Sequence, residues 1–427
     1  MGMTLTEKIC ARAAAKDRVR AGDMIDAAVD KLYIKDLRFS KAEDPQGLYG
    51  VFKEILKEMG VSKAWDPDKI IINFDEQPAR STRRAEGQER AKQFAGEHGA
   101  TVYEGYQGGI GHNVMVEKGH VRPGEFIVGA DSHSCTYGAL ACFATGIGFT
   151  ETVGVLATGR IWLKVPPAIY AELRGKRPPW IWGKDIILRI MAEVGSNGAV
   201  NKSIEYGGSA VAEISIESRL SMCNMAVESL ALNAVFPPDA RTIEYVKQVS
   251  NAPFIPVESD ADADYESRLS FDLTDMEPFV AAPGVPSNGQ PVHEFIGTKI
   301  NQAFIGTCSN SRIEDLRVAA KILKGKTVHP GVRMIVTPAS YAAYFQAREE
   351  GLLQIFEKSK VLLTASECGI CTRPSLATGE VCISSGNRNF PGRMGRRDAE
   401  IFLASPATVA ASAVAGEIVD PREFLPS

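Results

Sequence analysis

The chain of 427 residues is 44% hydrophobic and 23% charged, with a formal net charge of -4. These values are typical of a globular protein, and the length predicts about two to four domains. The weak negative charge speaks against a nucleic-acid partner. No apolar run is long enough to span a bilayer, and the charged first residues lack the apolar core of a signal peptide. We therefore expect a cytoplasmic protein without a membrane partner.

Helix and strand patterns alternate along the first third of the chain. Residues 5–14, LTEKICARAA, follow a Thr cap, and residues 47–60 have helical spacing. Residues 69–74, KIIINF, have the pattern of a buried strand. In residues 124–148, a strand pattern is followed by a polar turn and a segment rich in Gly and Ala. This alternation predicts an α/β fold.

Two further blocks follow. A helical pattern begins at residues 184–195, KDIILRIMAEVG, and an acidic stretch that becomes rich in Pro and Gly, residues 251–290, indicates an exposed connector. Beyond His293, strand patterns lead through tight turns into helices. We predict a first α/β domain at 1–165, a second with the connector at 166–290, and a third at 291–427.

The eight cysteines divide into two groups. We expect buried packing roles for those that lie among small or apolar residues, which are Cys10, Cys135, Cys142, Cys223 and Cys382. Structural disulfides are disfavoured in the cytoplasm, so the others are candidate ligands or catalytic groups. Cys308 lies at a predicted strand-to-helix turn in FIGTCSNSRIEDL, and Cys368 and Cys371 end the stretch LLTASECGIC, after another strand pattern.

The three remaining sulfurs are expected at the same edge of one sheet, because parallel strands end there together. Three thiolates suit an iron–sulfur cluster with one metal left open as a Lewis acid. The CxxC spacing alone leaves an incidental pair, a redox couple or half of a zinc site open as alternatives.

Two polar segments add candidate site residues. Asp131, Ser132 and His133 lie in the turn between apolar stretches, and Asn387, Arg388 and Arg393 lie in the loop GNRNFPGRMG. Two arginines in one loop suit the bidentate binding of carboxylates. Either segment alone is more often a capped turn or a solvated loop. Only their occurrence together supports a functional site.

With these motifs in view, the chain resembles the aconitase family, and within it the large subunits of the 3-isopropylmalate dehydratase and homoaconitase type. The resemblance covers nearly the whole chain, with specific matches at EKGHVRPGEFIVGADSHSCTYGALACFATGIG, IEYGGSA, MCNMAVE, FIGTCSNSRIEDL and GEVCISSGNRNFPGRMG. It implies three α/β/α domains around a 4Fe–4S cluster with one open iron, held by Cys308, Cys368 and Cys371.

The resemblance also implies roles for individual residues. Asp131, Ser132 and His133 would line the site, with Ser132 binding substrate, and His112 in GGIGHN would belong to it as a second catalytic histidine. Glu205 in IEYGG would hydrogen-bond the water on the open iron. Asn387 would support the cluster, and Arg388 and Arg393 would bind a substrate carboxylate.

Three positions depart from the family pattern. Lys35 stands where His or Gln is expected, and Asp75 is followed by Glu76 where the family has an Asp-His pair whose histidine protonates the leaving hydroxyl. Glu76 would serve as that acid only if burial kept it protonated. Positive charge is added by Lys35, Arg80, Arg83, Arg84 and Arg373, which together would suit a more highly charged acid than isopropylmalate. The alternative for Arg80, Arg83 and Arg84 is a solvated surface.

The resemblance thus implies a hydro-lyase that dehydrates and rehydrates, and so isomerises, a hydroxy di- or tricarboxylic acid in a primary or secondary pathway. The family's base is a serine on a mobile fourth domain, which split members carry on a separate small subunit. We therefore expect such a subunit as partner. The alternatives are a cluster-bearing member with lost activity that acts in regulation or binding, and a zinc protein.

Overall fold

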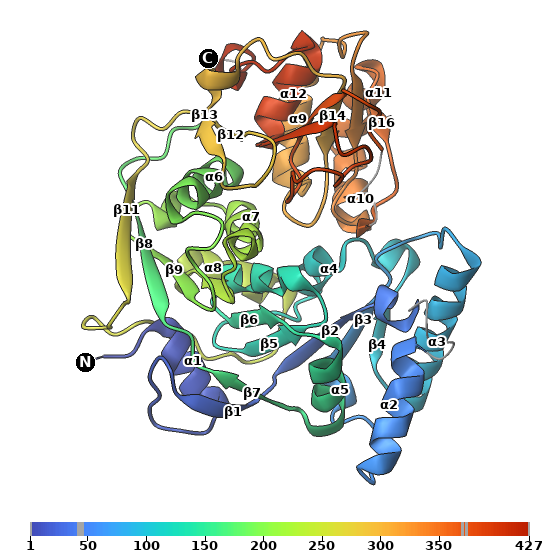
Figure 1. Ribbon diagram of the computed structural model, residues 1–427, viewed down its shortest axis with the longest axis vertical. Coiled ribbons are helices and arrows are strands. Elements are labelled where there is room, and N and C mark those ends of the chain that lie inside the picture. Colours follow the sequence, from blue (N-terminus) through green and yellow to red (C-terminus); the bar gives the residue numbers. More distant parts are fainter. Residues whose placement is uncertain (1, 41–46, 369–370, 372–374, 426–427) are drawn as a thin grey trace. The chain divides into compact units, whose positions relative to one another are not determined.

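The computed structural model describes residues 2–40, 47–368, 371 and 375–425 (Figure 1). It divides into two compact units. Unit 1 comprises residues 1–171, 201–207 and 231–269, and unit 2 comprises residues 172–200, 208–230 and 270–427. The predicted three-domain boundaries differ from this division and remain a prediction. Among the described helices, none has the length and apolarity that a bilayer crossing requires.

Unit 1 is built on a parallel sheet of five strands in the order β4-β3-β2-β5-β6. Its strands are β2 (Lys31–Lys35), β3 (Ile70–Asn73), β4 (Thr101–Tyr103), β5 (Phe126–Gly129) and β6 (Phe143–Gly146). Its helices are α1 (Leu5–Ala13), α2 (Gly47–Glu58), α3 (Thr82–His98), α4 (Gly111–Glu117), α5 (Phe149–Thr158) and α8 (Ala240–Val249).

The sequence of β3, four buried residues in a row, is that of a strand covered on both faces. Helix α3 begins at the Ser81 cap and ends at Gly99, whose φ of 79° lies in the left-handed region. Helices α2 and α3 pack together, with α3 beside β4 (Figure 1). The termini of these elements place polar residues at the carboxyl edge of the sheet.

Smaller sheets complete this part of the chain. Strands β1 (Met24–Ala28) and β7 (Arg160–Lys164) form an antiparallel pair. A four-stranded sheet has the order β10-β9-β8-β11, and the unit boundaries fall within β8 and β11. Its strands are β8 (Ala168–Arg174), β9 (Ser203–Gly207), β10 (Asn233–Val235) and β11 (Ser267–Asp272).

Unit 2 contains a seven-stranded sheet in the order β13-β12-β18-β17-β14-β15-β16. Its strands are β12 (Phe279–Ala281), β13 (Gly289–Pro291), β14 (Gln302–Ile305), β15 (Arg333–Val336), β16 (Leu362–Leu363), β17 (Val381–Ser384) and β18 (Glu400–Ala404). Its helices are α6 (Gly183–Val194), α7 (Ile216–Ala226), α9 (Ile313–Leu323), α10 (Tyr341–Glu349), α11 (Leu352–Lys358) and α12 (Pro406–Ala415).

The predicted exposed connector, residues 251–290, contains strands β11 and β12 and the start of β13. Residues 279–281 form β12, which pairs antiparallel with β13 and with β18, and Val280 and Ala281 are buried. The neighbouring Pro and Gly residues hid a strand of only three residues, too short to show an alternating pattern. The chain between the predicted second and third blocks therefore contributes to the last sheet.

Candidate active site

Unit 1 gathers polar side chains at the carboxyl edge of its parallel sheet. Lys35 ends β2, while Asp75 and Asp131 follow β3 and β5, the strands on either side of it. The Lys35 ammonium lies 3.2 Å from Asp75 Oδ2 and 3.4 Å from Asp131 Oδ2. Its side chain is 15% exposed and that of Asp75 only 2%. One largely buried cation thus bridges two carboxylates.

The other oxygen of Asp75 is surrounded by donors. Oδ1 accepts hydrogen bonds from Tyr33 Oη at 3.1 Å, Asn73 Nδ2 at 2.5 Å and the Gly111 amide at 2.9 Å. Gly111 must be glycine, because a Cβ there would lie 2.0 Å from Tyr33 Oη. These donors hold Asp75 as an oriented anion beside Lys35.

Asp131 lies between Lys35 and two histidines. Its Oδ1 contacts His112 Nε2 at 2.9 Å and accepts from the His133 amide at 3.0 Å. His112 Nδ1 contacts Tyr137 Oη at 3.0 Å, which fixes both ring nitrogens. Burial alone would raise the pKa of Asp131, but the Lys35 charge and the histidine hydrogen bonds outweigh it and hold that pKa well below 3.8.

Ser132 and His133 complete this group. Ser132 Oγ lies 3.2 Å from His133 Nδ1, and the rings of His112 and His133 have centroids 6.5 Å apart. The structure therefore brings together the predicted residues Lys35, Asp75, His112, Asp131, Ser132 and His133.

Glu76 points to different partners. Its Oε2 lies 3.5 Å from Arg84 Nε, and its carbonyl oxygen accepts from Gln88 Nε2 at 2.8 Å. An ion pair with a guanidinium stabilises a charged carboxylate, so this contact does not support the acid role proposed from sequence. Asp36 is the buried carboxyl beside Asp75, and burial, together with the Asp75 charge, raises its pKa to about 6.

The Glu205 carboxylate binds backbone amides at the start of α1 and two hydroxyl groups. Its Oε1 accepts from the Thr6 amide at 2.8 Å, and its Oε2 accepts from the Leu5 amide at 3.3 Å and from Ser259 and Tyr265, each at 3.0 Å. The carboxylate therefore satisfies the first amides of α1, where the helix dipole also favours a negative charge. None of these partners belongs to the Lys35–Asp131 group.

In unit 2, the cysteines follow strands of the seven-stranded sheet. Cys308 comes after β14 and Cys368 and Cys371 after β16, and none of the three forms a disulfide. Cys308 is buried, and its Sγ accepts from Asn387 Nδ2 at 3.6 Å. Asn387 Nδ2 also bonds Asn224 Oδ1 in α7. The cluster-supporting role predicted for Asn387 thus has a direct contact to one predicted ligand.

The two predicted arginines differ in their partners. Arg393 Nη2 lies 3.2 Å from Cys371 Sγ, whereas Arg388 Nε lies 2.8 Å from Glu228 Oε1. Arg388 therefore already forms an ion pair with a carboxylate of the protein itself. Arg373, the third departure noted in the sequence, lies outside the described residues.

The donor set suits an iron–sulfur cluster. Three thiols outside any disulfide, with an amide N–H at Cys308 and a guanidinium at Cys371, suit an anionic metal–thiolate group. Among the described residues, no three Cys, His, Asp or Glu side chains are already arranged to hold a single metal ion. The chemistry of the residues fits the cluster, and the described geometry contains no preformed single-metal site.

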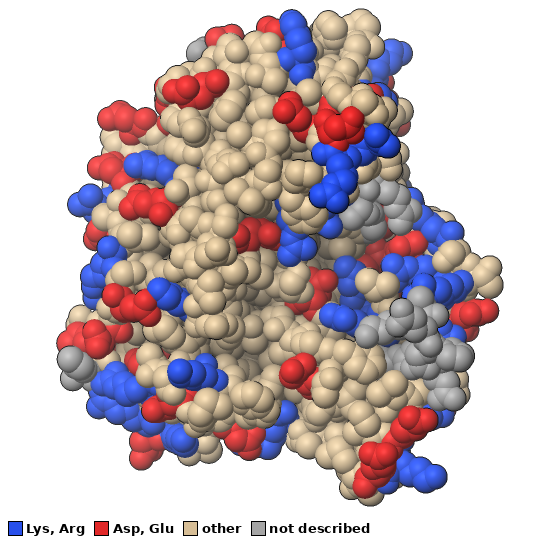
Figure 2. All heavy atoms as spheres, in the orientation of Figure 1, with Lys and Arg blue, Asp and Glu red and all other residues tan. Residues whose placement is uncertain are grey.

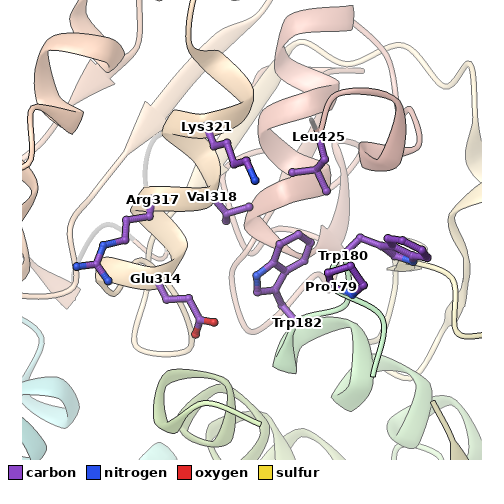
Figure 3. Close-up of a pocket in the computed structure, with 8 residues that line it drawn as sticks. All are labelled: Pro179, Trp180, Trp182, Glu314, Arg317, Val318, Lys321 and Leu425. Carbon is purple, nitrogen blue, oxygen red and sulfur yellow. The ribbon is translucent and has the colours of Figure 1, made fainter. Parts of the chain in front are cut away.

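A separate cavity of about 320 Å³ lies beside α9 in unit 2 (Figure 3). Trp180, Trp182, Val318 and Leu425 form its apolar walls, and the Glu314 carboxyl points into it. Burial raises the pKa of Glu314 to about 7. The cavity contains none of the predicted site residues, so it is distinct from the cysteine loops.

Sequence reasoning missed several residues of these two groups. The aromatic and amide partners in unit 1 are Tyr33, Asn73 and Tyr137, and the missed residues of unit 2 are Asn224 and Glu228. Asn73 at a strand end two positions before Asp75, and Asn224 in the motif MCNMAVE, were visible signals. Glu228 ends the same motif, whereas Tyr33 gave no signal, because its role depends on a partner distant in sequence.

The comparisons identify the family. A model of the aconitase family (aconitate hydratase) matches residues 57–299 and 293–416. The fold also resembles the crystal structure of Thermococcus kodakaraensis aconitase X in its holo-form, with a TM-score of 0.50 and 10% identity over 86% of this chain and 84% of that chain. At this identity the likeness shows the fold alone. The chain belongs to the aconitase family and is a hydro-lyase with an aconitase-like α/β fold.

Named relatives extend over the full length. The chain is 45% identical over 429 residues to 3-isopropylmalate dehydratase large subunit 1 of Methanopyrus kandleri, with 100% of each chain covered. It is 43% identical over 434 residues to the 3-isopropylmalate dehydratase large subunit of Aquifex aeolicus, covering 100% of this chain and 98% of the relative.

These matches confirm the resemblance inferred from the motifs. Family and relatives imply an iron–sulfur cluster, and the words "large subunit" imply a small-subunit partner. Both relatives are named as dehydratases and give no support to a regulatory protein without activity.

Proposed function

We propose that this chain is the large, catalytic subunit of a hydro-lyase that isomerises a hydroxy di- or tricarboxylic acid, of the 3-isopropylmalate type or a secondary-pathway analogue. The observation that carries the proposal is the set of three cysteines after two parallel strands of one sheet, in a chain whose full-length relatives are named 3-isopropylmalate dehydratase large subunits.

The proposed cofactor is a 4Fe–4S cluster held by Cys308, Cys368 and Cys371. With three protein thiolates, one iron remains open and supplies Lewis-acid chemistry at a hydroxyl and a carboxylate of the substrate. The Asn387 amide would hold the Cys308 sulfur, to which it already donates. Arg393, beside Cys371, would balance the thiolate charge and bind a substrate carboxylate.

Asp131, His112 and His133 would handle the substrate's hydroxyl end. His112 has one ring nitrogen on Asp131 and the other on Tyr137, an arrangement that sets the tautomer of the ring and its orientation. The low pKa of Asp131 keeps it charged near neutral pH, so it orients His112 rather than donating a proton itself. Ser132, next to His133, would donate to a substrate carboxylate.

Lys35 and Asp75 would take over the place of the family's Asp-His pair. The Lys35 ammonium, fixed by two carboxylates, offers N–H donors for the leaving hydroxyl or for a carboxylate of the substrate. The charge of Arg393 suits an acid with more negative charge than isopropylmalate, whereas the charges of Lys35 and Arg388 are already paired with carboxylates of the protein. Glu76 and Glu205 remain proposals from sequence, and their described contacts are to Arg84 and to α1.

The dehydration removes a proton from one carbon while the hydroxyl leaves the neighbouring carbon and takes up a proton to become water. Rehydration at the other carbon completes the isomerisation. We place the base that removes the carbon-bound proton on a swivelling domain of a separate small subunit. The complex would work in the cytoplasm, where a reducing environment keeps ligand thiols free.

The test is anaerobic reconstitution of the chain with iron and sulfide, followed by assays with and without a candidate small subunit on a panel of hydroxy-diacids and unsaturated diacids. We expect turnover only with the small subunit, and its loss in Cys371→Ser. Full turnover by the chain alone would overturn the partner proposal, and stoichiometric zinc in place of iron would overturn the cofactor.

A further inference from the structure

Lys184 is a fully buried cation that the proposed chemistry does not use. It lies in α6 of unit 2, which packs on α7 (Figure 1). Its side chain is 0% exposed. Its Nζ donates to the Gly386 carbonyl oxygen at 2.8 Å and to Ser309 Oγ at 3.1 Å, and lies 3.5 Å from Met225 Sδ.

The acceptors of Lys184 belong to the segments that hold Cys308. Ser309 is the residue after Cys308, and Gly386 precedes Asn387, whose amide contacts the Cys308 sulfur. Met225 follows Asn224, the hydrogen-bond partner of Asn387. A single ammonium therefore links the loop after β14, the loop after β17 and the end of α7.

The charge of Lys184 is not balanced by these contacts. The three acceptors are a hydroxyl, a carbonyl and a thioether, all neutral, and within the described part of the chain no carboxylate lies within ion-pair distance of it. Burial lowers its pKa to about 7, against the opposing effect of charges on Asp315 and Cys308. A buried ammonium without an anion in direct contact is costly, so an anion bound nearby would stabilise it.

We infer that Lys184 is a positioning residue for the metal–thiolate centre, whose negative charge its ammonium balances while it holds the two loops around Cys308 in place. This inference rests on the proposed function. Hydrogen bonds and charges outside the ligand shell commonly tune the metal affinity and the reduction potential of such centres. Removing one such contact often lowers the metal affinity by about 10- to 100-fold.

The experiment compares the wild-type chain with Lys184→Gln, which keeps an N–H donor without the charge, and Lys184→Met, which removes both. Arg189→Gln is the matched control, because Arg189 is also a cation in α6 and its guanidinium donates to the Asp272 carbonyl at 2.6 Å. Each chain is reconstituted with iron and sulfide. Iron retention against a chelator and the reduction potential are then measured.

Both Lys184 variants should lose iron about ten times faster than the wild type, with a lower reduction potential, and Arg189→Gln should behave like the wild type. Equal retention and equal potential in all four chains would overturn the inference. A wild-type chain that takes up no cluster would instead overturn the proposed function.

A second readout separates positioning from folding. Thermal unfolding is measured for each chain with and without the cluster, and the gain in Tm on reconstitution is compared. We expect a smaller gain in the Lys184 variants, because binding of an anionic centre no longer relieves a buried cation. An equal loss of Tm in the cluster-free and reconstituted forms would show a structural role alone and refute the inference.

Discussion

Breaking the contact between Lys35 and Asp75 should lower the free energy of unfolding, and the burial of Asp75 indicates by how much. Lys35→Met leaves the Asp75 carboxylate, 2% exposed, without its cation. Removing one member of a buried ion pair costs about 3–5 kcal/mol. Because Asp75 keeps donors from Tyr33, Asn73 and Gly111, we expect the lower end, about 3 kcal/mol in the free energy of unfolding.

The pair is best measured by a double-mutant cycle. Asp75→Asn alone leaves the Lys35 ammonium with Asp131, and the double variant leaves no unpaired charge at this contact. We expect the double variant to be about 2 kcal/mol more stable than the sum of the single effects predicts. Lys31→Met is the matched control, because Lys31 lies on the same strand and donates to the Asp68 carbonyl at 2.7 Å.

The assay is urea unfolding of the chain without cluster, followed by circular dichroism, with the transition of unit 1 fitted separately from that of unit 2. Additivity within about 0.5 kcal/mol would refute the reasoning, since it would mean that the two charges do not interact.

Three other predictions follow from individual carboxylates and cations. Burial raises the pKa of Glu314 from 4.5 to about 7, so stability should fall as the pH rises from about 4.5 to 7, and Glu314→Gln should flatten this fall in a Tm-against-pH series. Glu205→Gln should cost about 2 kcal/mol in unfolding experiments by weakening the contact to the first amides of α1, and leave kcat of the reconstituted complex within about threefold. A drop in kcat of a hundredfold or more would restore the catalytic role. Arg393→Lys should raise KM at least about tenfold in steady-state assays, because an ammonium cannot replace a bidentate guanidinium; an unchanged KM would exclude Arg393 from substrate binding.

The strand-end motifs made much of the site predictable from sequence. Parallel strands end at the same sheet edge, and the structure places Asp131 after β5 and Asp75 after β3, both of them beside Lys35. The same logic correctly assigned Cys308 and Cys368 to the edge of one sheet, after β14 and β16.

Partners distant in sequence were not predictable. Glu205 matches a catalytic motif, yet its contacts to α1 depend on how the chain returns to its N-terminus, which no local pattern encodes. Lys184 stands in an ordinary amphipathic helix pattern and was given no role, although its acceptors lie 125 and 202 positions away. Strand β12 was missed because three residues carry no usable period.

The most direct test of the account is one anaerobic experiment on the chain together with a candidate small subunit. Iron and sulfide are measured after reconstitution, and 3-isopropylmalate and more highly charged hydroxy acids are assayed for water loss. The account predicts about four iron and four sulfide per chain, with turnover that requires the small subunit and disappears in Cys308→Ser. A chain that binds no iron–sulfur cluster, or a cluster-loaded complex that dehydrates none of these acids, would contradict it.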